Sequence, residues 1–283
     1  MTTTVFLAVI LAALLHASWN AMVKGGADKY AAMAAVMLGH IPPALACLPF
    51  ASVPDAAAWP WFAAGIVCHL GYQLFLIAGY RLGDLTQVYP IARGAAPLIV
   101  AVVSVAFLAV PLGRTELLAV AMIGVGIISI SLVRHADGSR NPRAVAMALV
   151  TGCFIASYSL VDGIGARVAG TALGYWSWAA IGNALVFVVW MAFRNPAVLR
   201  RLPRDRALIR LGLAGGAASF AAYALVIWAF TQAPIALVTA LRETSIVFAL
   251  LIGVFVLKER LNLGKVLSTL VTISGAILLR ASR

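Results

Sequence analysis

Long apolar runs, separated by short polar or basic stretches, cover this chain from end to end. A helix needs about 20 apolar residues to cross the hydrocarbon core of a bilayer, and ten runs approach or exceed that length. Gly, Pro and charged residues mark where the runs end. The pattern predicts ten transmembrane helices, at residues 5–23, 31–50, 60–80, 85–109, 115–133, 143–163, 172–193, 207–230, 234–257 and 262–280.

The composition narrows the class of protein. Of the 283 residues, 63% are hydrophobic and 11% are charged, and the mean hydropathy is +1.02. Soluble domains have about 45–50% apolar and about 25% charged residues, so a soluble globule is excluded. An outer-membrane barrel would show short alternating segments rather than continuous runs. We therefore expect an all-α polytopic membrane protein that works within the bilayer.

Weak internal similarity suggests two halves, residues 1–138 and 139–283. ASWN at 17–20 and ASYS at 156–159 lie 139 residues apart, and three single matches lie 149 residues apart: Arg93 with Arg242, Leu112 with Leu261, and Gly126 with Gly275. A repeat of five spans inserts the second copy upside down, and such inverted repeats recur in transporters, with the substrate site between the halves. Chance similarity between Leu-, Ala- and Gly-rich helices is the alternative.

The basic residues predict the topology. Short loops rich in Lys and Arg stay in the cytoplasm, so the net charge of +12 does not indicate nucleic-acid binding. The loops after even-numbered spans, with both tails, hold only Arg114, Arg167, Arg280 and Arg283. The loops after odd-numbered spans hold Lys24, Lys29, Arg81, Arg134, Arg140, Arg143, the residues of Arg194–Arg210, Lys258, Arg260 and Lys265. This bias places the Arg194–Arg210 loop in the cytoplasm and both termini outside.

The first run ends in LLHASWNAMVK, where polar side chains recur at helical spacing. His16, Trp19, Asn20 and Lys24 fall along one face of a helix. Within an inverted repeat, that face is expected to look into the shared cavity, with His16 as the first residue to mutate. Lys24 ends the helix and is expected to reach the membrane interface.

Three charged residues lie inside the later spans. Arg93 is in VYPIARGAAP, and Arg242 and Glu243 are in ALVTALRETS. An Arg at the centre of a membrane helix costs about 2.5–3.5 kcal/mol, so each should face a partner or a cavity. Either they form a structural ion pair, or they form an anion clamp or a coupling-ion site. Neighbours on a helix point about 100° apart, so we expect Glu243 to pair with Arg93 rather than with Arg242, which leaves Arg242 for a ligand.

Other polar residues add weaker candidates. Tyr158 and Asp162 share a face of the sixth span, where Asp162 is either a solvated helix-end charge or, if deeper, a proton carrier. His69, Gln73 and Tyr80 share a face of the third span, next to Tyr72. Tyr223 in the eighth span fits either a cavity or lipid. His40 is interpreted as a packing or hydrogen-bonded residue rather than a ligand. Four tryptophans that begin spans are expected as interfacial anchors: Trp59, Trp61, Trp176 and Trp178.

Motifs for catalysis, nucleotide binding and metal binding are missing from the sequence. It has no HExxH, GxSxG or Walker A pattern, and its four His and three Cys are scattered. We therefore expect neither an enzyme nor a bound cofactor or metal, and any uphill transport must use a gradient.

Several segments resemble one transporter family. LLHASWNAMVK, VYPIARGAAP, ASYSLVDGIGAR and FALLIGVFVLKERL, in this order across ten spans, resemble the EamA-type branch of the drug/metabolite transporter superfamily. The resemblance implies alternating access around a central cavity formed by the first, third, fourth, sixth, eighth and ninth helices. It also implies the cavity positions His16, Trp19, Asn20, Tyr72, Gln73, Tyr89, Arg93, Tyr158, Asp162, Tyr223, Arg242 and Glu243. Many members have both termini in the cytoplasm, whereas the charge bias here predicts the reverse.

These patterns lead to one functional prediction with open alternatives. We expect a secondary transporter or facilitator, in the bacterial cytoplasmic membrane, for a small zwitterionic or anionic metabolite such as an amino acid. Proton coupling is one option, with Asp162 and Glu243 as the candidate coupling-ion residues. A multidrug exporter for aromatic cations ranks second and a lipid-linked sugar flippase third, and an intramembrane enzyme is the alternative from another class. Besides substrate, protons and lipid, we expect no further partner, in a monomer or a homodimer.

Overall fold

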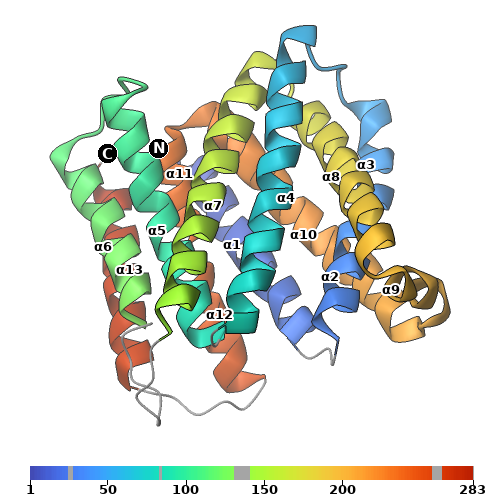
Figure 1. Cartoon of the computed structure of the whole chain (residues 1–283). Coiled ribbons are helices and arrows are strands. Elements are labelled where there is room, and N and C mark those ends of the chain that lie inside the picture. The colour runs from blue at the N-terminus through green and yellow to red at the C-terminus, as the bar shows by residue number, and fades with distance from the viewer. Residues whose placement is uncertain (25–27, 83–84, 131–140, 257–262, 283) are drawn as a thin grey trace.

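The computed structural model describes residues 1–24, 28–82, 85–130, 141–256 and 263–282. Within these residues it is a bundle of helices without strands (Figure 1). The side chains of Lys24, Lys29, Tyr80 and Lys265 lie outside the described part. So do several basic residues used for the topology prediction, namely Arg134, Arg140, Lys258, Arg260 and Arg283.

The first half of the chain forms six α-helices within the described residues. These are α1 (Thr3–Lys24), α2 (Lys29–Leu38), α3 (Ile41–Cys47), α4 (Trp59–Leu82), α5 (Leu85–Ala106) and α6 (Arg114–Ile130). The short 3-10 turns η1 (Leu48–Phe50) and η2 (Ala56–Ala58) lead from α3 to α4. α5 runs through Pro90 and Pro97 without ending.

The remaining helices lie in residues 141–282. They are α7 (Pro142–Val168), α8 (Ala172–Arg194), α9 (Pro196–Arg201), the 3-10 turn η3 (Leu202–Arg204), α10 (Arg206–Gln232), α11 (Ile235–Arg242), α12 (Ser245–Phe255) and α13 (Leu263–Ala281). Eight segments of the described chain are long and apolar enough to cross a membrane, and Val266–Ala281 is a shorter apolar helix. The ten predicted spans correspond to these nine segments and α6, so the all-α membrane fold is confirmed.

Two spans that were expected as single helices are interrupted. The second span breaks at Gly39–His40, between α2 and α3, because Pro42 and Pro43 follow and a proline lacks the amide that an upstream turn would need. The ninth span breaks at Glu243–Thr244, between α11 and α12. There the Thr244 hydroxyl donates to the Leu241 carbonyl at 2.7 Å, a local bond that competes with the helix.

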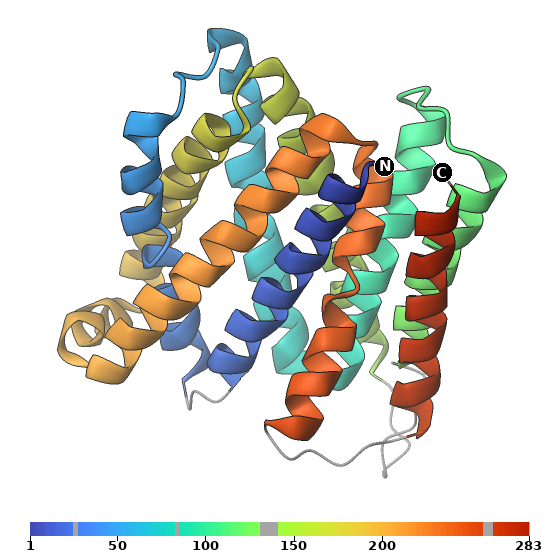
Figure 2. The same ribbon diagram turned by 180° about the vertical axis from the view of Figure 1, so that it is seen from behind.

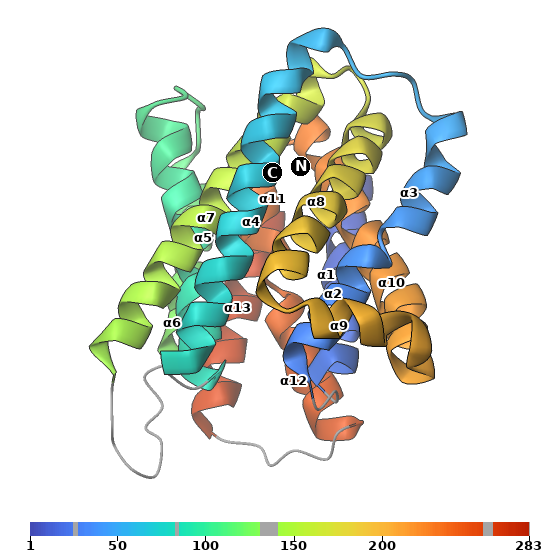
Figure 3. The same cartoon turned by 45° about the vertical axis from the view of Figure 1, so that its right-hand side comes forward.

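Small residues let the helices approach closely. A Cβ added at Gly216 of α10 would lie 2.5 Å from Gly39, so the backbones of α10 and the α2 end are in direct contact. α1 and α10 run side by side, and α13 packs along α6, where the Ser268 hydroxyl donates to the Gly126 carbonyl (Figure 2). α8 lies between α4 and the α2–α3 pair (Figure 3).

The predicted Arg194–Arg210 loop is itself folded. α9 and η3 fill its centre, and Val198 and Leu202 are buried against α2 and α8. Asp205 then caps α10: hydrogen bonds from the Leu208 amide, the Arg201 side chain and the Ala207 amide hold the pKa of Asp205 below its ordinary value. The termini and α9 lie toward opposite ends of the bundle (Figures 1 and 2).

Candidate functional site

A cavity lies inside the bundle, where helices from both halves of the chain meet. It is bordered by α1, α4, α5, α7, α10 and α11, as the resemblance implied, and also by α2 and α8. Its lining residues are Ala12, His16, Trp19, Met33, Met37, His40, His69, Tyr72, Gln73, Arg93, Tyr158, Trp176, Asn183, Ser219, Ala222, Tyr223, Val226 and Arg242.

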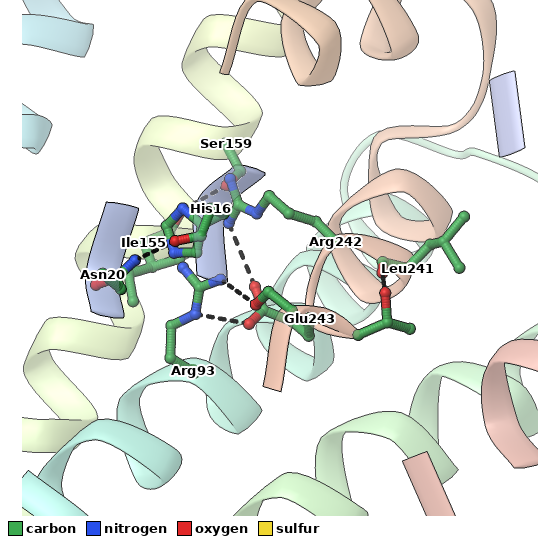
Figure 4. A network of polar contacts seen from close by, with 10 residues as sticks. His16, Asn20, Arg93, Ile155, Ser159, Leu241, Arg242 and Glu243 are labelled. Atoms are coloured by element: carbon green, nitrogen blue, oxygen red, sulfur yellow. Dashed lines mark hydrogen bonds and ion pairs between the residues drawn. The ribbon is translucent and has the colours of Figure 1, made fainter. Parts of the chain in front are cut away.

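Two arginines share one carboxylate at the side of this cavity. Arg93 Nε lies 2.7 Å from Glu243 Oε2, and Arg242 Nη2 lies 3.5 Å from Glu243 Oε1. We call these three residues, all buried, the arginine cluster. Figure 4 shows both guanidinium groups facing the Glu243 carboxylate, with His16 beside them. The expected Arg93–Glu243 pair is therefore present and ties α5 to the second half.

The expectation that Arg242 and Glu243 cannot pair well is met only in part, because Arg242 Nη2 does contact Glu243 Oε1, at 3.5 Å against 2.7 Å for the Arg93 contact. It assumed that both residues lie on one continuous helix, whereas α11 ends at Arg242 and α12 starts at Ser245. The break places the Glu243 carboxylate between the two arginines, so a single acidic residue serves both.

Arg242 nevertheless keeps bonding capacity toward the cavity. Its guanidinium carbon lies 5.8 Å from the Tyr158 ring centroid and 5.9 Å from that of Tyr223, within the range of cation–π attraction. Its Nε atom is buried and has no hydrogen-bond partner among the described residues. The Arg93 guanidinium instead lies over Tyr89, at 5.8 Å.

A second polar cluster is centred on Asp162, which is 1% exposed. His69 Nε2 lies 2.8 Å from Oδ2, the Tyr223 hydroxyl donates to Oδ2 at 2.8 Å, and the Tyr175 hydroxyl donates to Oδ1 at 3.2 Å. We call these four residues the aspartate cluster. Asp162 is therefore not a solvated helix-end charge: it is a buried acceptor that joins α7 to α4, α8 and α10.

Five cavity residues carry a buried polar atom without a hydrogen-bond partner in the described part of the chain. Two are donors, Trp19 Nε1 and Arg242 Nε; two are acceptors, Gln73 Oε1 and Asn183 Oδ1; the fifth is His40 Nε2. Each of these side chains is at least nine-tenths buried. Buried polar groups are normally paired, and each unpaired one needs an explanation. Five around one cavity point to a polar ligand.

The structure brings most of the predicted site residues together. Eight of the twelve line the cavity: His16, Trp19, Tyr72, Gln73, Arg93, Tyr158, Tyr223 and Arg242. Asp162 and Glu243 lie behind them, each bonded to lining residues. Tyr89 packs against Arg93. Asn20 does not line the cavity, because its amide donates to the His16 carbonyl at 2.7 Å, within α1.

The expectation for Trp176 is wrong. Rather than anchoring the chain at the interface, it is 3% exposed, lines the cavity and donates from Nε1 to the Phe220 carbonyl at 3.0 Å. Trp178 is 45% exposed, as an anchor would be. The two lie two residues apart, on different sides of α8, and only packing decides which one faces inward.

Other cavity residues were not among the predicted site residues. His69 and His40 had been noted without being assigned to the cavity, and Met33, Met37, Asn183 and Ser219 had not been noted at all. The helices of His69 and Ser219, α4 and α10, were expected at the cavity, whereas α2 and α8 were not. An amide within an apolar span, as at Asn183, was the available signal.

The described residues contain no group of three or more His, Cys, Asp and Glu side chains placed to hold a metal ion. Residues 142–281 match the EamA-like transporter family. No curated protein matches the chain in sequence. A solved structure titled "Crystal structure of protein" superposes with a TM-score of 0.74 at 14% identity, covering 100% of this chain and 98% of that one. At that identity the likeness shows the fold alone.

Proposed function

Since residues 142–281 belong to the EamA-like transporter family, the chain is a membrane transporter of the drug/metabolite type, and on that premise we propose its substrate class. It is a secondary transporter, or a facilitator, of a small zwitterionic or anionic metabolite such as an amino acid. The substrate binds in the central cavity, which opens alternately to the two sides of the membrane.

The observation that carries this proposal is the set of five unpaired polar atoms. The donors at Trp19 and Arg242 suit a carboxylate, whereas the acceptor oxygens of Gln73 and Asn183 suit an ammonium group. A zwitterion supplies both kinds of partner, while a simple anion satisfies only the donors. A buried group left unpaired costs about 1–3 kcal/mol, so a ligand that completes these bonds gains a comparable free energy.

A cationic drug fits the same cavity less well. Arg242 and Arg93 both line it, and one carboxylate, Glu243, faces them both. An incoming cation would meet the charge of Arg242 in a region of low dielectric, where like charges repel strongly. The aromatic rings of Tyr158 and Tyr223, which would otherwise attract the cation, are already next to Arg242.

The two candidate coupling residues differ in their surroundings. Glu243 is held by two permanently charged guanidinium groups, so it serves as their structural counter-ion. Asp162 contacts the His69 ring and accepts hydrogen bonds from two tyrosine hydroxyls, so it has no permanently charged group as its partner. Asp162 is therefore the favoured site for a coupling proton.

Uptake into proteoliposomes tests the substrate class. The purified protein would be reconstituted and offered each of the twenty amino acids with a radiolabel, and separately the cation ethidium, with and without an imposed pH gradient. We expect uptake of one or more amino acids and none of ethidium.

Charge variants make the test specific to the cavity. Arg242→Gln should lower amino-acid uptake about tenfold or more, since a hydrogen bond to a charged group contributes about 1.5–3 kcal/mol. Arg210→Gln, at an exposed position on α10, is the matched control and should transport normally. Ethidium uptake, or full activity of Arg242→Gln, would refute the proposal.

A further inference from the structure

One side chain links Arg242 of the arginine cluster directly to Asp162 of the aspartate cluster. The Tyr223 ring lies against the Arg242 guanidinium, while its hydroxyl donates to Asp162 at 2.8 Å. Tyr158 also contacts Arg242 through its ring, but no hydrogen bond joins its hydroxyl to Asp162 within the described residues. Tyr175 bonds Asp162 and does not line the cavity. Tyr158 reaches the aspartate cluster only by stacking on His69, so among these three tyrosines only Tyr223 both lies against Arg242 and hydrogen-bonds to Asp162.

We propose that Tyr223 couples proton binding at the Asp162–His69 pair to carboxylate binding at Arg242, so that the proton and the anion bind together. This inference rests on the proposed function, because it assigns the carboxylate of the transported compound to Arg242. Tyr223 acts as a positioning residue between two separate sites.

The charges around the cavity favour joint binding of the proton and the carboxylate over competition between them. Arg93 and Arg242 are balanced by Glu243 and Asp162, so an added carboxylate leaves an excess negative charge in a region of low dielectric. A proton taken from the water and bound by the Asp162–His69 pair removes that excess. When the cavity opens to the other side, the proton and the anion return to water. The arginine cluster and the aspartate cluster then have the charges and hydrogen bonds that they had before binding.

The hydrogen bond from Tyr223 supplies the link. Asp162 Oδ2 accepts from both His69 and Tyr223. Hydrogen bonds to an ionised carboxylate are roughly twice as strong as those between neutral groups. Protonation of Asp162 therefore weakens the hydrogen bond that it accepts from the Tyr223 hydroxyl. The released hydroxyl, which belongs to a lining residue beside Arg242, can then donate to the carboxylate of the bound compound.

Few other titratable groups face Asp162. His69 and Cys68 face it from α4, Tyr175 from α8 and Tyr223 from α10. On α7 itself, the Tyr158 ring stacks on His69 with the centroids 4.2 Å apart. The charged groups of α5 and α11 are directed elsewhere, with Arg93 bound to Glu243 and Arg242 over the tyrosine rings.

Trp176 offers an optical readout of this site. Its ring centroid lies 4.6 Å from that of Tyr223 and 6.3 Å from that of His69. The test is a pH titration of tryptophan emission from the full chain in detergent, in sodium chloride and then in sodium acetate of equal ionic strength. Acetate serves as the carboxylate probe. Asp162→Asn and Trp176→Phe should each remove the titration.

Acetate should move the midpoint of the wild-type titration to higher pH by about one unit, a tenfold effect that is typical of linked sites. Tyr223→Phe should keep a titration and lose the acetate effect. Tyr175→Phe should change the midpoint of the titration, but acetate should still move that midpoint to higher pH. Tyr158→Phe should also keep this response to acetate, even if transport is slower. Gel filtration of each variant separates loss of coupling from loss of folding.

The outcomes separate this inference from the proposed function. A midpoint that acetate leaves unchanged, or moves to lower pH, overturns the inference, as does an acetate effect that survives in Tyr223→Phe. Since this titration needs no transport, it decides the coupling even if proteoliposomes take up none of the amino acids, a result that would refute only the proposed function.

Discussion

At the residue scale, the most constrained contact is the ion pair between Arg93 and Glu243, 3% and 1% exposed. Removing one partner of a buried pair leaves an uncompensated charge in a dry environment, at a cost of about 3–5 kcal/mol, whereas removing both avoids that cost. The pair also holds Glu243 where it serves Arg242, so the contact shapes the proposed anion site.

We expect Arg93→Ala and Glu243→Ala each to lower the midpoint of thermal unfolding and to abolish uptake. The double variant should recover most of the stability. Thermal unfolding followed by gel filtration in detergent measures the first effect, and proteoliposome uptake the second. Losses that simply add in the double variant would show that the two residues act independently.

The sequence predicted individual site residues best where a charged residue lies inside a transmembrane span. Arg93, Arg242 and Glu243 were recognisable because an unpaired charge in a span is costly. Trp176 and Asn183 could not be placed in the same way. An indole suits a membrane interface as well as a cavity, and the side of α8 that faces inward depends on its packing against α4 and α3.

At the element scale, the positions of the helices were predictable and their interruptions were not. The hydrophobic runs gave most boundaries to within a few residues, because the thickness of the bilayer fixes the length of a span. The mean hydropathy of each span stays high across the breaks at Gly39–His40 and Glu243–Thr244, so a hydropathy average does not reveal them. The two consecutive prolines that follow His40 were the only local signal for the first.

The contact between α10 and the end of α2 gives a prediction for helix packing. Gly216→Ala should destabilise the protein by about 1–3 kcal/mol, because its Cβ would meet backbone atoms of Gly39, which cannot rotate away. Gly113→Ala is the control, since the nearest atom to its Cβ would be 3.9 Å away. The midpoint of thermal unfolding should fall for Gly216→Ala alone. Equal midpoints for the two variants would show that the backbones can separate without cost.

At the scale of the whole molecule, the charge distribution predicts how the bundle is oriented in the membrane. Six arginines lie within Arg194–Arg210, and most remain exposed around α9, toward the end of the bundle away from the termini (Figures 1 and 2). Basic loops resist translocation across the membrane. The repeat assignment, 1–138 and 139–283, stays a prediction, and the match to residues 142–281 lies within its second half.

A reporter fused to the C-terminus tests this orientation. In bacterial cells, alkaline phosphatase, which is active only outside the cytoplasm, should be active, and green fluorescent protein, which folds in the cytoplasm, should stay dark. Replacing the arginines of Arg194–Arg210 by glutamine should give a mixed population. Fluorescence from the unmodified sequence would contradict the predicted topology.

The balance between two guanidinium groups and two carboxylates has an electrical consequence. An empty carrier with this balance presents no net charge to the membrane potential, which otherwise acts with about 2.3 kcal/mol per charge per 100 mV. A monovalent anion that travels with one proton keeps the carrier neutral, whereas a zwitterion with one proton makes it positive. The response of the transport rate to voltage would therefore report the net charge of the natural substrate.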